Sequence, residues 1–152
     1  MDLNGVIRKG DLMEVMELVE ANADLVNQKD ERGFTPLIMA TYSSQPEIAK
    51  YLLEQGADIN AQDSAGNTAL MGVCFKGYKD LATLLISQGA NLDIVNFNNS
   101  TALIYAASFA QKEIVELLLT KGADKTIKDK RGNTAYDHAH FQGIPGLSAL
   151  LK

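Results

Sequence analysis

Apolar residues recur along the chain at helical spacing, in short stretches that polar turns separate. Three of these stretches share one length and one pattern of apolar positions, so each is expected to form an amphipathic helix with one buried face. The predicted helices are Glu47–Gln55, Asp80–Gln88 and Glu113–Lys121, with apolar sets Ile48/Leu52/Leu53, Leu81/Leu84/Leu85 and Ile114/Leu117/Leu118. A glycine that is expected to end the helix in the left-handed conformation follows each stretch, at Gly56, Gly89 and Gly122.

A second segment stands before each of these helices and carries its own marker. The marker is seen as Gly33-Phe34-Thr35-Pro36-Leu37, Gly66-Asn67-Thr68-Ala69-Leu70, Asn99-Ser100-Thr101-Ala102-Leu103 and Gly132-Asn133-Thr134-Ala135-Tyr136. Its threonines stand at 35, 68, 101 and 134, so the sequence repeats every 33 residues. A turn that begins with Asp or Asn precedes each marker, and threonine is a good N-cap for a following helix. The pattern predicts helix pairs whose apolar faces are buried by stacking on neighbouring pairs.

A 33-residue period with this marker resembles the ankyrin repeat, and the resemblance covers nearly the whole chain. It implies an all-α solenoid of stacked helix–turn–helix units, joined by β-turn or hairpin-like loops. We expect a single domain, residues 1–152. Within it, residues 1–27 form an N-terminal capping unit, 28–60, 61–93 and 94–126 form internal repeats, and 127–152 form a C-terminal capping unit.

The two ends of the chain vary the repeat. Leu3, Val6 and Ile7 predict a short first helix, and a Gly10-Asp11 turn separates it from the next apolar stretch. Asn22 stands where the later repeats have glycine, so we expect it in the left-handed conformation.

Two further features concern how the second helices begin. Pro145 follows Pro46 by three whole periods, and each is expected to start a second helix, where its missing N–H costs nothing. Ser44 and Ala110 occupy the place that Gly77 and Gly143 hold in other repeats, which leaves the geometry of those two turns open.

Composition excludes some partners. The net charge is −5, which disfavours nucleic acid as a partner because phosphate binding needs clustered Lys and Arg. The charge is uneven, with eight Asp/Glu against three Lys/Arg in residues 1–31 and six Lys/Arg against three Asp/Glu in residues 121–152. No apolar run reaches the roughly 20 residues that span a bilayer, so no membrane partner is expected. The N-terminus lacks a signal-peptide core, which favours the cytoplasm, or the periplasm if a signal peptide has been removed.

Candidate chemistry is sparse. His138 and His140 are two residues apart on a predicted helix, so they point in different directions and do not form a metal pair. The single Cys74 falls on an inner helix, where a buried inert thiol is expected. An enzyme that uses Asp137, His138 and His140 is a remote alternative. No catalytic, cofactor or metal site is predicted.

The resemblance implies that partner contacts come from the turn tips and the ends of the first helices. All five phenylalanines fall at these places, and large exposed rings are typical anchors of protein interfaces. The predicted partner-binding residues are Arg32, Phe34, Tyr42, Phe75, Lys76, Phe97, Phe109, Lys130, Arg131 and Phe141.

The main hypothesis is a non-enzymatic protein-binding module, a monomer on its own, that grips one folded partner. The chain resembles the stand-alone ankyrin proteins common in bacteria, some of which restrain or protect an enzyme. An inhibitor or immunity-type role is therefore the sharper form of the hypothesis. A passive scaffold or adaptor that joins two proteins is the alternative.

Overall fold

The computed structural model describes residues 2–152, and over that range the chain is all-α, without strands. The all-α class and the helix–turn–helix units predicted from the repeat are confirmed. The chain divides into two compact units, with the boundary between Ala69 and Leu70.

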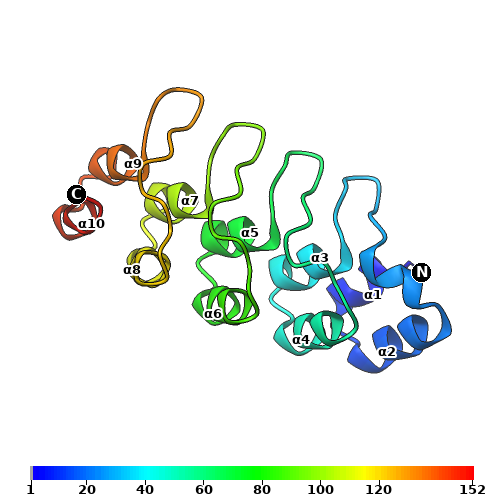
Figure 1. Ribbon diagram of the computed structural model, residues 1–152. Coiled ribbons are helices and arrows are strands. Elements are labelled where there is room, and N and C mark those ends of the chain that lie inside the picture. The colour runs from blue at the N-terminus through cyan, green and yellow to red at the C-terminus, as the bar shows by residue number, and fades with distance from the viewer. Residues whose placement is uncertain (1) are drawn as a thin grey trace. The chain divides into compact units, whose positions relative to one another are not determined.

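The first unit holds two helix pairs. Its elements are α1 (Leu3–Lys9), α2 (Leu12–Ala21), the 3-10 helix η1 (Ala23–Asn27), α3 (Pro36–Tyr42) and α4 (Pro46–Glu54). First helix packs on first helix, α1 on α3, and second on second, α2 on α4 (Figure 1). The two layers meet over fully buried side chains, among them Val6, Ile7, Leu37, Ile48 and Leu52.

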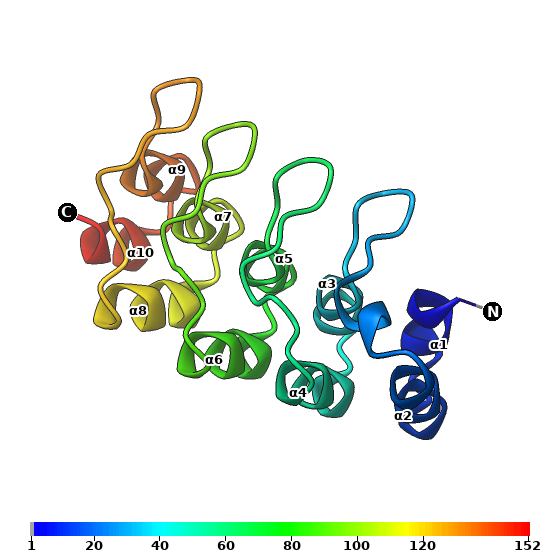
Figure 2. The same ribbon diagram turned by 45° about the vertical axis from the view of Figure 1, so that its right-hand side comes forward.

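The second unit repeats this arrangement. Its elements are α5 (Ala69–Lys76), which begins at the boundary, α6 (Lys79–Ser87), α7 (Ala102–Ser108), α8 (Lys112–Thr120), α9 (Ala135–Phe141) and α10 (Pro145–Leu150). Helix α7 packs on α9, while α8 packs on α6 and α10. The long loops before α7 and α9 extend together beyond the layer of first helices (Figure 2). The core side chains include Val73, Leu85, Leu103, Leu118 and Leu147.

Equivalent hydrogen bonds join successive repeats inside each unit. In the first unit, Asn27 Oδ1 accepts from the N–H of Asp58 at 2.7 Å, and in the second, Asp93 Oδ1 accepts from the N–H of Asp124 at 2.9 Å. The turns are joined as well, because the N–H of Ser64 donates to the carbonyl of Arg32 at 3.2 Å. In the second unit the N–H of Lys130 donates to the carbonyl of Asn98 in the same way.

Most local predictions hold. Thr35 and Thr101 cap their helices by accepting from the N–H three residues on, and Pro46 and Pro145 begin α4 and α10. The helices predicted at 47–55, 80–88 and 113–121 each begin and end one residue earlier than expected. The glycines that follow them have φ of 93–94°, the left-handed conformation.

The expectation for Asn22 is wrong. Its φ is −152°, an extended conformation, and its side chain accepts from the N–H of Asp24 at 3.1 Å. The longer junction at Leu25-Val26-Asn27 folds into η1, so Asn22 is the N-cap of that 3-10 helix. An N-cap residue has an extended backbone, so Asn22 does not adopt the left-handed conformation here.

The open question of Ser44 and Ala110 is resolved. Both residues have positive φ, 55° and 57°, close to the 79° and 70° of Gly77 and Gly143. The turn is therefore the same in all four repeats, and a non-glycine residue there costs roughly 1–2 kcal/mol. A Cβ at Gly77 would lie 2.6 Å from the side chain of Gln111.

Candidate functional site

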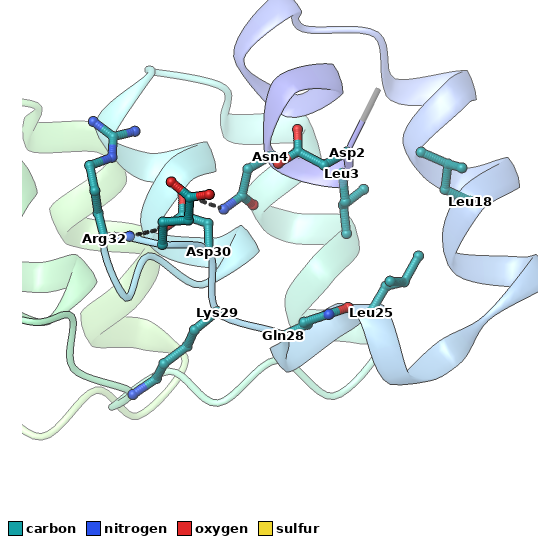
Figure 3. A pocket seen from close by; sticks show the side chains of 10 residues that line it. Asp2, Leu3, Asn4, Leu18, Leu25, Gln28, Lys29, Asp30 and Arg32 are labelled. Atoms are coloured by element: carbon teal, nitrogen blue, oxygen red, sulfur yellow. Dashed lines mark hydrogen bonds between the residues drawn. The ribbon is translucent and has the colours of Figure 1, made fainter.

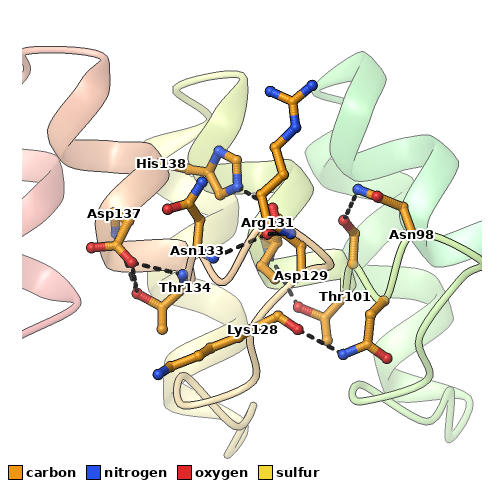
Figure 4. Close-up of polar contacts among 12 residues, drawn as sticks. Asn98, Thr101, Lys128, Asp129, Arg131, Asn133, Thr134, Asp137 and His138 are labelled. Atoms are coloured by element: carbon orange, nitrogen blue, oxygen red, sulfur yellow. Dashed lines mark hydrogen bonds and ion pairs between the residues drawn. The ribbon is translucent and has the colours of Figure 1, made fainter.

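A buried carboxylate ties the last turn of the second unit to α9. Asp129 begins the turn, and its Oδ1 accepts from the N–H groups of Arg131 and Asn133, at 3.0 Å each. Its Oδ2 lies 2.7 Å from Nε2 of His138 on α9 (Figure 4). The side chain of Asp129 is 3% exposed. The turn is thus held rigidly from inside, while Lys130 and Arg131 stay exposed on its outer side.

The surroundings of Asp129 favour its charged form. Burial acts to raise its pKa, but the hydrogen bonds from His138 and from the backbone of Asn133 and Arg131 outweigh burial and hold the pKa below its usual range. Asp129 is therefore a carboxylate at neutral pH, and both of its oxygens already have hydrogen-bond partners inside the fold.

The turn before α7 uses the same geometry with neutral groups. Asn96 Oδ1 accepts from the N–H groups of Asn98 and Ser100, and its Nδ2 donates to the hydroxyl of Tyr105 on α7 at 3.0 Å. Tyr105 and His138 are 33 residues apart, so both repeats bond their first turn residue to the residue nine positions on. The bond orients the ring of Tyr105.

Three rings meet at the ends of α5 and α7. The rings of Phe75 and Phe109 lie edge to face, with centroids 4.6 Å apart and planes at 87°. Tyr105 stacks on Phe109 at 6.4 Å. Phe75 and Phe109 are nonetheless 38% and 47% exposed, so each ring packs on its neighbour and still presents apolar surface to solvent.

Hydrogen bonds connect these rings to the exposed turn tips. The N–H of Lys130 donates to the carbonyl of Asn98 at 3.1 Å, so the two turns of the second unit lie side by side. Phe97 stands next to Asn98 and is 65% exposed. Asn96 of the same turn bonds the hydroxyl of Tyr105, and Tyr105 stacks on Phe109. A continuous chain of contacts therefore joins the rings to the turn that carries Lys130 and Arg131.

Phe141 completes this surface. It is 67% exposed and touches His138 with its ring edge-on at 6.1 Å. The following residue, Gln142, donates from its side chain to the carbonyl of Ser108 at the end of α7. We call this surface the aromatic face, defined by Phe75, Phe97, Tyr105, Phe109, Lys130, Arg131, His138 and Phe141.

The first unit carries the other predicted contact residues. The guanidinium of Arg32 lies 4.5 Å from the centre of the Phe34 ring, a cation–π contact, and Phe34 is half-buried. Tyr42, at the end of α3, is 38% exposed. Arg32 covers the ring of Phe34, whereas the ring of Tyr42 is open to solvent. These residues present a smaller apolar surface than the aromatic face.

The first unit also has an open pocket among α1, α2, η1 and the first turn (Figure 3). Asn4 lines it and is tied to the turn, because its Nδ2 donates to Asp30 Oδ2 and to the carbonyl of Phe34, both at 3.1 Å. The pKa of Asp30 is lowered: burial acts to raise it, and the bonds from Asn4, Phe34 and Arg32 outweigh burial. Asn4 thus fills the place that His138 fills for Asp129.

The residues of the remote enzyme alternative do not form a common site. Asp137 accepts from the N–H and hydroxyl of Thr134 in a capping box, His138 is bonded to Asp129, and His140 stacks on Tyr136. Cys74 is fully buried, which raises the pKa of its thiol and keeps it protonated.

Two further findings concern residues 2–152. Within that range, no cluster of three or more His, Cys, Asp or Glu side chains is arranged to hold a metal ion. No helix in the same range has both the length and the apolar character that a bilayer crossing requires.

Sequence comparison places this architecture in a family. A model described as ankyrin repeats (3 copies) matches residues 5–63 and 60–129. The chain belongs to the ankyrin-repeat family. Repeats of this family serve generally as non-enzymatic modules for protein–protein interaction, and their partners are proteins.

Curated relatives match over about a third of the chain. Ankyrin repeat and SAM domain-containing protein 6 of Rattus norvegicus is 50% identical over 50 residues, 33% of this chain and 6% of that protein. DNA-binding protein RFXANK of Homo sapiens is 40% identical over 58 residues, 38% and 22%. Protein phosphatase 1 regulatory subunit 27 of Homo sapiens is 43% identical over 56 residues, 37% and 36%. The match therefore spans about a third of the third relative's length and less of the first two.

Two members of the aromatic face, Tyr105 and His138, were not among the predicted contact residues. The signal was available, because both lie nine residues after the first residue of a turn, one repeat apart. The period alone does not say that these two positions touch, since that contact depends on how the turn folds back over the helix.

Proposed function

We propose that this protein binds one folded protein partner through the aromatic face, without catalysing a reaction. The proposed contacts in the second unit are Phe75, Phe97, Phe109, Lys130, Arg131 and Phe141 of the aromatic face, together with Lys76, which follows Phe75 in the chain. Arg32, Phe34 and Tyr42 of the first unit are proposed as additional contacts. A monomer in the absence of the partner is part of the proposal.

One observation supports this most strongly. Phe75 and Phe109 are locked against each other, yet each leaves more than a third of its surface in water. Preorganised aromatic side chains lose little conformational entropy on binding and are typical hot spots of interfaces. The buried Asp129–His138 bond fixes the turn that carries Lys130 and Arg131 to α9, so this part of the surface is also set before a partner arrives.

The finer form of the proposal is regulation: binding inhibits or protects an enzyme. The name of one relative, a regulatory subunit of a protein phosphatase, supports an enzyme as the kind of partner. An activity assay of the captured partner separates this form from a passive adaptor. A change in rate or stability of the partner enzyme supports regulation, and unchanged activity supports an adaptor.

The test is a double substitution, Phe75→Ala with Phe109→Ala. A partner captured with the wild-type chain is purified and titrated against both forms by calorimetry. Loss of two central rings should weaken binding by at least roughly 100-fold. Met13→Ala is the matched control, because Met13 is an exposed apolar residue, 73% exposed, on α2 of the other unit. Unchanged affinity of the double variant, with an unchanged melting curve, would contradict the proposal.

A further inference from the structure

The charges around the aromatic face are one-sided. The segments that form it are α5, α7, α9 and the turns before α7 and α9, and their cations are Lys76, Lys130 and Arg131, all exposed. The carboxylates in the same segments are Asp129 and Asp137. Cations therefore outnumber carboxylates by three to two.

Both carboxylates are occupied by internal donors. Asp129 is buried and bonded by His138 and by two backbone N–H groups, and Asp137 bonds Thr134 in the capping box. A bonded carboxylate offers little to an incoming group, whereas the side chains of Lys130 and Arg131 are exposed to water. The aromatic face therefore meets a partner as a surface of rings and cations.

The first unit has the opposite character. The first unit carries twelve Asp/Glu against five Lys/Arg, and the second carries seven against nine. Salt limits charge effects to about 8 Å at physiological ionic strength, so a bound segment responds to the groups it touches rather than to the net charge of the chain. The cations that an acidic segment can touch at the aromatic face therefore decide its binding there.

We infer that the aromatic face binds an acidic polypeptide segment, in which Asp or Glu residues flank a bulky apolar side chain. The apolar side chain packs on Phe75 and Phe109, and the carboxylates accept from Lys130 and Arg131, whose guanidinium can bind a carboxylate in bidentate fashion. This inference rests on the proposed function, since it names the chemistry of the partner at the same surface.

The experiment is a selection of 12-residue peptides from a random displayed library on the immobilised full-length chain. Each binder is tested again on the Phe75→Ala/Phe109→Ala variant, and only peptides that this variant fails to hold are scored. We expect the scored peptides to be enriched in Asp and Glu beside an aromatic or large aliphatic residue.

A charge reversal then tests the role of the cations. Lys130→Glu with Arg131→Glu should weaken a scored peptide roughly tenfold or more, because two attractive contacts become repulsive. Lys121→Glu with Lys125→Glu makes the same change in net charge elsewhere in the second unit and should alter affinity less than about twofold. Circular dichroism melts establish that each variant is folded.

The outcomes separate the two proposals. Scored peptides without acidic enrichment, or with basic enrichment, overturn the inference and leave the proposed function standing. If no peptide depends on Phe75 and Phe109, the inference of a linear acidic segment fails, and the calorimetric titration of the captured partner alone decides the proposed function.

Discussion

The two units are built on one frame and differ in what they show to solvent. In the first, Met39 lies on α3 and Ser43 directly follows that helix, with Ser43 Oγ 3.5 Å from the sulfur of the buried Met39. In the second, the equivalent residues are Tyr105 on α7 and Phe109 directly after it, which stack and stay partly exposed. The backbone bonds are alike in both units, so the repeat sets the fold and the few variable places set the surface.

The turns differ in the same way. Asp30 in the first unit is held by Asn4 of α1, whereas Asp129 in the second is held by His138 of its own repeat. Asn96 keeps the same turn with no charge at all. The turn needs a side-chain oxygen that accepts from two backbone N–H groups, and either Asp or Asn supplies it. The partner of the other polar atom of that side chain differs from repeat to repeat.

The largest expected effect tests whether the second helices of the two units are packed equally well. Leu52 and Leu118 are one position of the repeat, two periods apart, and neither has any exposed surface. We expect Leu52→Ala and Leu118→Ala each to lower the free energy of unfolding by about 2–5 kcal/mol, through the cavity each leaves. Urea unfolding, followed by circular dichroism, measures the loss.

Leu119→Ala is the control for this pair, because Leu119 lies on the same helix and is only half-buried. Its cost should be clearly smaller than that of Leu118→Ala. A loss below about 1 kcal/mol for Leu118→Ala would show that the second helices do not close a packed core.

A smaller effect separates the two charged turns by pH. The pKa of Asp129 and that of Asp30 are lowered in the fold, so each carboxylate stabilises the fold above the pKa of the unfolded chain, and this stabilisation is lost as the pH falls through the folded pKa. Asp129→Asn should cost about 1–2 kcal/mol at pH 7, since it removes a charge-assisted bond to His138. The difference from wild type should shrink as the pH falls below the ordinary aspartate pKa of about 3.9.

Asp30→Asn provides the comparison, because its acceptor contacts are to Asn4 and the backbone, with no histidine. Its cost at pH 7 should be the smaller of the two. If Asp129→Asn left stability unchanged at pH 7, the bond to His138 would contribute nothing to the fold.

The sequence alone was sufficient to predict the helices of the repeat and approximately where they begin and end. A fixed period places Thr35 and Thr101 as caps and Gly56, Gly89 and Gly122 after the helices, because these roles depend on local backbone geometry. The surface was predicted only as a set of positions. That Phe75 meets Phe109, that Tyr105 joins them and that Arg32 covers Phe34 depend on side-chain orientation, which spacing does not determine.

The most direct measurement uses a variant in which two residues of the aromatic face are replaced by their counterparts from the first unit. The variant Tyr105→Met/Phe109→Ser carries the residue types of Met39 and Ser43, which hold the equivalent positions in the first unit. The captured partner is titrated against this variant by calorimetry. If the aromatic face is the binding surface, affinity should fall by at least roughly 100-fold while the melting curve shows an intact fold. Wild-type affinity in this variant would contradict the account.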